Sequence, residues 1–308
     1  MIKFPPPNRL ARRRFMHTSL ALVATHTLST SPVVQALGAP ANLRLGSGSG
    51  PDPDASNTGV PTGVTLTNSG SIVTTSNGQV IQNLNVTGSI EVRHSNVTIR
   101  RCRITGPFSI WAGIGRNNSS TGTLVEDCEV NGNRALGSYG IGVSGTVRRC
   151  RVWGVENGLN PQANSTYEDN YVYGLNPTGT DPHSDAVPMQ GGTSNVIVRH
   201  NTLDITGASG FNAHFFINSY FGATDNVLID NNLLVGVPAV RQGFNFYSYR
   251  DGTWPSLTNV RITNNRIKLA PWGVFSDQYG NGPGRVNVLT EWANNTNIDT
   301  GAIIPIPI

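Results

Sequence analysis

Three residues with acid–base side chains lie close together in the segment GLNPTGTDPHSDAVPMQGG, residues 174 to 192. Asp181, His183 and Asp185 fall within five positions of one another. Two carboxyl groups and an imidazole supply the acid, base and charge stabiliser that proton-transfer catalysis requires. The same two aspartates are the clustered candidates for binding Ca²⁺, although that cation usually takes roughly six to eight oxygen ligands. We predict this segment as catalytic and leave a requirement for Ca²⁺ open.

A second group of candidates follows in FNFYSYRDG, residues 244 to 252. Tyr249 has the side chain of a proton donor to a leaving sugar oxygen, and Arg250 that of a bidentate clamp for a uronate carboxylate. Together with Tyr247, the aromatic side chains also fit an alternative role, a platform that binds sugar without any chemistry.

A repeated pattern surrounds these residues and predicts the elements that position them. In each repeat two apolar positions alternate with a polar one, two polar residues follow, and a Cys or Asn precedes a further apolar residue. The segments are 97–104, 124–130, 147–152, 166–172, 196–203, 227–234 and 260–267. The alternation predicts strands with one face inward, and the paired polar residues predict a bend between two strands. A repeat of about 20 to 33 residues predicts an all-β solenoid, a single parallel β-helix of about eight or more turns.

One column of this repeat carries small polar or thiol side chains. Its members are Cys102, Cys128, Cys150, Asn170, Asn201, Asn232 and Asn265, with Leu84 as an earlier member. Asparagines stacked at strand spacing satisfy one another's amide groups, and a thiol fits the same space. Because the cysteines lack CxxC spacing, we interpret them as part of the core and not as a metal site.

The two polar residues before that column alternate in charge from turn to turn. They are Arg100, Glu126, Arg148, Glu168, Arg199 and Asp230, beside Arg101, Asp127, Arg149, Asp169, His200 and Asn231. Neighbouring turns lie about 4.8 Å apart, so opposite charges face each other. We therefore interpret Arg199 and His200 as structural, although their side chains would suit catalysis.

A second strand in each turn is predicted at 139–144, 157–162, 184–190, 213–219, 244–249 and 272–277. We expect inward side chains at Ile141, Leu159, Val187, Phe216, Phe246 and Val274. The residues between them then line a long, shallow outer groove, with substrate contacts at Asn160, Gln190, Asn245 and Tyr247. This register places Asp185 between Asn157 and His214, which makes His214 a second candidate base.

The first 38 residues are predicted to be an export signal. Residues 12 to 16 read RRRFM, which resembles the twin-arginine motif, and the segment after them is too weakly apolar to span a membrane. We divide the chain into this signal (1–38), a linker with the first strands (39–77) and the β-helix (78–308). Five of the 22 basic residues and none of the 18 acidic ones lie in the signal, leaving 22 − 5 = 17 against 18. A nearly neutral mature chain without a basic patch argues against nucleic-acid binding.

Residues 78 to 295 resemble the right-handed parallel β-helix, pectate-lyase-like superfamily of exported polysaccharide-active proteins. The DPH at Asp181 to His183 is similar to the active-site motif of mannuronan C5-epimerases, in which the aspartate and histidine transfer protons at C5 of a uronate. The epimerases' next acidic residue is replaced here by Ser184. The HSDAV at 183 to 187 also resembles the NTDG segment of polygalacturonases, which would make Asp185 a catalytic acid, but their paired DD and GHG motifs are missing.

These features predict a monomeric, secreted or periplasmic enzyme that acts on a polysaccharide, acidic in the leading hypothesis. That hypothesis is a lyase that abstracts the C5 proton of a uronate and eliminates, with His183 or His214 as base, Tyr249 as acid and Arg250 as clamp. A C5-epimerase would share the first step. The alternatives are a glycoside hydrolase using Asp181 and Asp185, and a β-helix that binds carbohydrate without catalysis.

Overall fold

The computed structural model describes residues 50–112, 120–249, 256–277 and 289–306. All of them belong to one compact unit, Gly46–Ile308. The predicted signal (1–38) and Arg250 lie outside the described residues.

The described chain forms three parallel sheets and has no helix. Sheet A contains β1 (Thr67–Ser69), β4 (Leu84–Thr87), β7 (Arg103–Thr105), β10 (Glu129–Asn131), β13 (Arg151–Trp153), β16 (Tyr171–Tyr173), β19 (Thr202–Asp204), β22 (Leu233–Val235), β25 (Arg266–Ile267) and β28 (Thr296–Asn297). Sheet B contains β2 (Ile72–Val73), β5 (Ile90–Val92), β8 (Phe108–Ala112), β11 (Tyr139–Gly142), β14 (Asn157–Leu159), β17 (Ser184–Met189), β20 (Phe211–Asn218), β23 (Phe244–Tyr249) and β26 (Phe275–Asp277). Sheet C contains β3 (Val80–Gln82), β6 (Thr98–Arg100), β9 (Thr123–Glu126), β12 (Gly145–Arg148), β15 (Ser165–Glu168), β18 (Val196–Arg199), β21 (Thr224–Asp230), β24 (Leu257–Thr263) and β27 (Leu289–Ala293).

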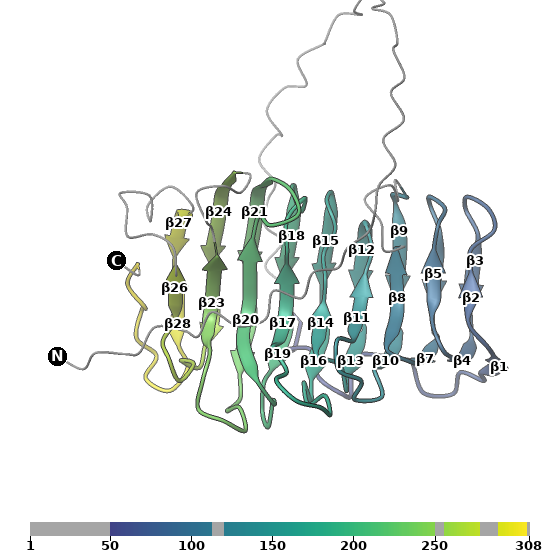
Figure 1. Ribbon diagram of the computed structural model, residues 1–308, viewed down its shortest axis with the longest axis horizontal. Helices are drawn as coiled ribbons and strands as arrows, with labels where there is room; N and C mark the ends of the chain where they lie inside the picture. Colours follow the sequence, from purple (N-terminus) through teal and green to yellow (C-terminus); the bar gives the residue numbers. More distant parts are fainter. Residues whose placement is uncertain (1–49, 113–119, 250–255, 278–288, 307–308) are drawn as a thin grey trace, which may run out of the picture. The chain divides into compact units, whose positions relative to one another are not determined.

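Each turn runs from sheet C through a bend into sheet A and then across a loop into sheet B, and successive turns lie side by side (Figure 1). The fold is therefore a right-handed parallel β-helix, as the repeat and the family resemblance predict. Among the residues described here, no helix is long and apolar enough to cross a membrane.

The bend between sheets C and A depends on one left-handed residue per turn. The φ angles are 50° to 58° at Arg101, Asp127, Arg149, Asp169, His200, Asn231, Asn264 and Asn294. These are the second of the paired polar positions in the repeat. Asn and Asp adopt this conformation more readily than other L-residues. For most other non-glycine residues it costs roughly 1–2 kcal/mol per residue. The doubled polar position in the sequence is therefore the corner of each turn.

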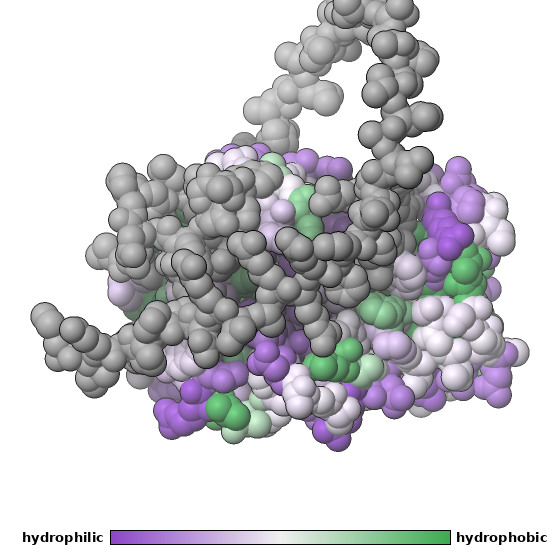
Figure 2. All heavy atoms as spheres, in the orientation of Figure 1, coloured by the Kyte–Doolittle hydropathy of each residue, from purple (hydrophilic) through white to green (hydrophobic). Residues whose placement is uncertain are grey.

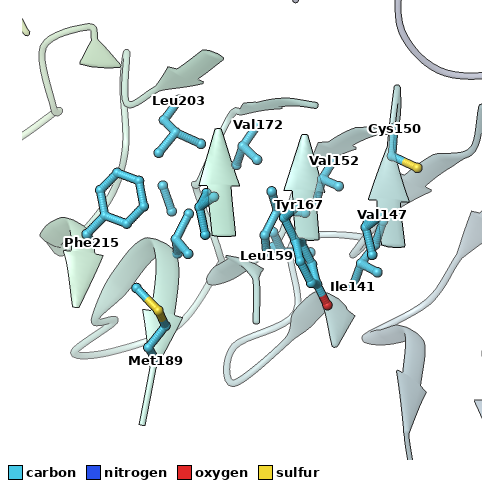
Figure 3. Packing of buried hydrophobic residues seen from close by; sticks show 14 of the residues in the cluster. Ile141, Val147, Cys150, Val152, Leu159, Tyr167, Val172, Met189, Leu203 and Phe215 are labelled. Atoms are coloured by element: carbon cyan, nitrogen blue, oxygen red, sulfur yellow. The ribbon is translucent and has the colours of Figure 1, made fainter. Parts of the chain in front are cut away.

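The residue after each corner forms the predicted core column. Asn170 Nδ2 donates to Asn201 Oδ1 at 2.9 Å, and the same oxygen accepts the Asn170 backbone N–H at 2.9 Å. Asn201, Asn232 and Asn265 repeat this arrangement, and Asn295 extends the column by one member that the sequence analysis missed. In the earlier turns the cysteines are buried and free, and Cys150 packs beside Val147 and Val152 (Figure 3). The column is confirmed.

The charge alternation before the column is also confirmed. Arg148 pairs with Glu126 at 2.8 Å, and Arg199 pairs with Glu168 at 2.6 Å. At the corner positions Arg149 pairs with Asp127 at 2.7 Å, and His200 with Asp169 at 2.6 Å. Arg199 and His200 are therefore bound to carboxylates of the preceding turn, as expected of structural residues.

The predicted inward side chains are confirmed at Ile141, Leu159, Val187 and Phe246, Val274 is half-buried against the core, and the prediction is wrong at Phe216. Val187 pairs with Phe215, which is fully buried, whereas Phe216 is half-buried and pairs with Pro188. Phe246 pairs with Phe275, which packs against the core together with Val274. The shift at Phe216 has a physical cause, a bulge in which Ser184 pairs with Phe211 but Asp185 pairs with Ala213. Asp185 therefore lies between Asn157 and Ala213, and not beside His214.

Large apolar side chains exposed at the surface are dispersed and include Tyr220, Phe221 and Trp272. On the face seen in Figure 2, hydrophilic residues surround separate hydrophobic patches. The apolar side chains are otherwise concentrated in a single core that runs between the three sheets.

Candidate active site

Four neighbouring strands of sheet B bring a polar group together around Asp185. Tyr139 of β11 pairs with Asn157 of β14, which pairs with Asp185 of β17, and Asp185 in turn pairs with Ala213 of β20. Because parallel strands stack in register, side chains distant in the sequence meet along this line.

Asp185 is a buried carboxyl group beside polar, partly exposed side chains. Its residue is 3% exposed, and its Oδ1 accepts a hydrogen bond from Asn212 Nδ2 at 2.8 Å. Burial raises the pKa of Asp185 well above its ordinary value, and the nearby Glu156 charge raises it further. The hydrogen bonds from Asn212 and from the Ala213 backbone oppose these effects. A carboxyl group in this environment retains its proton at a higher pH than an exposed aspartate does.

Glu156 holds two loops in place next to Asp185. It is 7% exposed, its Oε1 accepts the backbone N–H of His183 at 2.8 Å, and its Oε2 accepts that of Gly137. Its own backbone oxygen accepts the N–H of Asp185 at 3.2 Å. Since both carboxylate oxygens bind backbone donors, Glu156 positions the site and is not arranged for proton transfer.

Tyr139 is the third ionisable member of the group. Burial raises its pKa, the charges of Asp185 and Glu156 raise it further, and a hydrogen bond with Gln190 opposes the shift. Its ring stacks on Phe108 with centroids 6.3 Å apart, and the Trp111 ring contacts Phe108 at the same centroid distance. The phenol therefore stays protonated near neutral pH and adjoins an aromatic surface on β8 and β11.

The predicted residues Asp181 and His183 lie in the loop that leads into β17. Both are exposed, and Asp181 adopts φ of 61°. The loop is fastened to the turn that contains β10 and β11, two turns earlier, because Thr178 N and Oγ1 donate to the Arg134 carbonyl at 2.8 and 3.0 Å. With the Glu156 contact to His183, this places two solvent-accessible acid–base side chains just before the buried Asp185.

His214 and Asn245 belong to a separate, fully buried network. Asn245 Nδ2 donates to His214 Nδ1 at 3.2 Å and to the Lys268 carbonyl at 2.9 Å, while its Oδ1 accepts the Ala270 N–H at 2.9 Å. The Nε2 of His214 lies 3.4 Å from the Val235 carbonyl. Burial lowers the pKa of His214 to about 4, so the ring stays neutral. Both side chains therefore form hydrogen bonds that connect adjacent turns.

The remaining predicted contacts lie on or near sheet B. Tyr247 is half-buried and packs on Phe216 with centroids 5.1 Å apart, and Phe244 packs on Trp272 at 5.6 Å. Asn160 and Gln190 are half-buried. Tyr249 ends β23, but its side chain and all of Arg250 lie outside what the structure describes.

A calcium site does not emerge from the predicted pair. Asp181 is exposed, Asp185 is buried against an amide, and both Glu156 oxygens hold backbone N–H groups. Over the described ranges, no three His, Cys, Asp or Glu side chains form a group able to hold a metal ion. We derive no step through Ca²⁺.

The sequence analysis missed Glu156, Tyr139 and Asn212. A usable signal existed for Tyr139, because it begins a predicted second strand whose position matches that of Asp185. Comparison of the chain with protein-family models, curated proteins and solved structures gave no match. The assignment of function therefore depends on the site itself.

Proposed function

We propose that this protein cleaves a polysaccharide that lies along sheet B, and that Asp185 donates the proton to the leaving glycosidic oxygen. The observation that carries the proposal is the burial of the Asp185 carboxyl group between neighbouring turns, which raises its pKa. Cleavage of a glycosidic bond needs an acid that is still protonated near neutral pH, and burial is the usual means of producing one.

Aromatic side chains on both sides of Asp185 support a polymeric substrate. Phe108, Trp111 and Tyr139 lie on earlier turns, whereas Phe216 and Tyr247 lie on later turns of the same sheet. Aromatic rings offer an apolar face to sugar C–H groups, and tyrosine and tryptophan add a polar end. A chain crossing several turns would contact both aromatic groups while its scissile bond lies at Asp185.

The first candidate reaction is β-elimination on a uronate-containing polymer. His183 takes the C5 proton, the bond between C4 and its oxygen breaks, and Asp185 protonates that oxygen. The products are a C4–C5 unsaturated end and a new hydroxyl group. The exposed imidazole of His183, held by its backbone beside Asp185, supports this assignment. Asp185 thereby takes the role of acid that the sequence alone suggests for Tyr249.

The second candidate is hydrolysis, with Asp185 as acid and the exposed Asp181 as the base that activates water. The raised pKa of Asp185 favours it as the acid, and the solvent exposure of Asp181 favours it as the base. Export through the twin-arginine route fits either reaction and remains a proposal.

The test is to mix the mature protein with pectic, alginate and glucuronan polymers and to record ultraviolet absorbance and reducing ends together. New absorbance identifies elimination, and reducing ends alone identify hydrolysis. Asp185→Asn should lose at least 100-fold in rate, whereas Asp299→Asn, an exposed aspartate bound by Lys268, should not change it. Full activity in Asp185→Asn, or binding to every polymer without cleavage, would refute the proposal.

A further inference from the structure

A segment before the first strand crosses the outer face of sheet A and borders an open pocket there. This segment, residues 50–66, is held where Arg151 Nη1 donates to the Ala55 carbonyl at 2.9 Å and Gly59 N donates to the Arg149 carbonyl at 2.8 Å. The pocket has a volume of about 680 Å³ and is lined by this segment and by Arg103, Glu129 and Arg151. It is on a different sheet from Asp185.

The pocket wall contains two arginines, Arg103 and Arg151, and two carboxylates, Asp127 and Glu129, which are both already bound by arginines. Glu129 is buried between two arginines, with Oε2 2.7 Å from Arg103 Nε and Oε1 2.6 Å from Arg151 Nη2. The other acid in the wall, Asp127, is paired with Arg149 at 2.7 Å. Two guanidinium groups therefore share one carboxylate, which favours an anionic ligand.

Arg103 is the side chain with capacity to bind such a ligand. It is 49% exposed and uses Nε for Glu129, and no residue in the described ranges accepts a hydrogen bond from its two Nη atoms. Arg151 Nε is buried and likewise lacks a partner among those residues. A guanidinium group whose two Nη atoms are free can donate one hydrogen bond to each oxygen of a carboxylate, in a bidentate geometry.

An aromatic surface continues from the pocket across sheet A. The guanidinium of Arg151 lies 5.6 Å from the Trp153 ring centroid, Trp153 stacks on Tyr173 at 5.8 Å, and Tyr173 stacks on Tyr171 at 4.7 Å. All three rings are half-buried. Arginine beside aromatic rings can bind both the charged group and the apolar face of a sugar.

We infer that this pocket is a second carbohydrate site, which binds a carboxylated sugar unit through Arg103 and the adjoining aromatic surface. The choice of a uronate as ligand rests on the proposed function, whereas the pocket and the free Nη atoms of Arg103 do not. Such a site would hold one part of a polymer while another part lies on sheet B.

The test measures calorimetric binding of uronate trisaccharides to the mature Asp185→Asn protein, which would not consume them. Adding Arg103→Gln should weaken one binding site at least tenfold. Arg93→Gln should leave it unchanged, because that exposed arginine pairs only with Glu91 in the described structure. A neutral trisaccharide of equal length should bind at least tenfold more weakly than the uronate. Equal binding in the two arginine variants, or equal binding of the neutral sugar, would overturn the inference.

Turnover separates this inference from the proposed function. Binding that depends on Arg103 in a protein that cleaves nothing would retain the pocket and refute the proposed function. Cleavage that depends on Asp185, without any binding that depends on Arg103, would support the proposed function and refute the second binding site.

Discussion

Glu156 Oε1 accepts the backbone N–H of His183 at 2.8 Å, across one turn of the solenoid. The carboxylate thereby fixes the start of β17, and with it the distance between the exposed His183 and the buried Asp185. Gly137, on the turn before, is held by the other oxygen of Glu156. One buried side chain thus sets the geometry of three successive turns at the candidate site.

Replacing Glu156 with Gln should lower the cleavage rate about tenfold with a smaller effect on substrate binding. The amide keeps one acceptor oxygen but presents an N–H group to a backbone donor, so one of the two loops is released. Steady-state kinetics on the cleaved polymer measure this as a loss in kcat. Glu168→Gln, which weakens the ion pair with Arg199 on sheet C, should leave kcat unchanged. Equal losses in the two variants would contradict the positioning role.

The burial of Asp185 predicts a pH-dependent stability that its Asn variant lacks. The folded pKa is above the unfolded one, so the folded protein holds the extra proton. Its stability therefore declines as pH rises from the unfolded pKa through the folded pKa. Asp185→Asn should become progressively more stable relative to the wild type across that window. Urea unfolding at several pH values measures the difference, and a constant difference would contradict it.

His214 should show the opposite dependence. Burial lowers its pKa to about 4, so the unfolded state binds the additional proton between the ordinary histidine value and that pH. Stability is full above the unfolded pKa and is lost as pH falls through the folded one, by at most roughly 3 kcal/mol. His214→Gln should remove this loss in urea unfolding, and an unchanged pH profile would refute the assignment.

The two histidines should also differ in activity. His183→Gln should abolish elimination, because the candidate base is removed. A folded His214→Gln protein should retain most of its activity, since His214 does not lie beside Asp185. Initial rates on the same polymer measure both effects. The reverse order of losses would restore His214 as the base.

The asparagine column should contribute strongly to stability. Asn201→Ala removes the acceptor for Asn170 and the donor to the Tyr167 carbonyl, leaving buried polar groups without partners. We expect a loss of about 3 kcal/mol in the free energy of unfolding. Asn85→Ala, whose side chain bonds only to Asn68 near the surface, should cost well under about 1 kcal/mol. Similar losses in both variants would contradict the column's role.

The fold could be predicted from sequence because each turn carries the same types of residue at the same positions. Cys or Asn after two polar residues marks the core column, and the corner residues that precede it include Asn and Asp, which favour left-handed backbone. The register of β20 was not accessible in this way. Its run Ala213–Ile217 offers two adjacent phenylalanines, and only the bulge opposite Asp185 decides that Phe215 points inward. Glu156 binds the backbone N–H groups of Gly137 and His183, which belong to loops of different length in two other turns. The spacing of residues within one repeat does not predict where these loops lie.

Asp185 should keep its proton to a higher pH than the exposed aspartates do, and carbon NMR of the protein labelled at its aspartate carboxyl groups measures this. We predict one resonance that titrates well above the others and disappears in Asp185→Asn. If every aspartate resonance titrates in the ordinary range, Asp185 is not the proton donor.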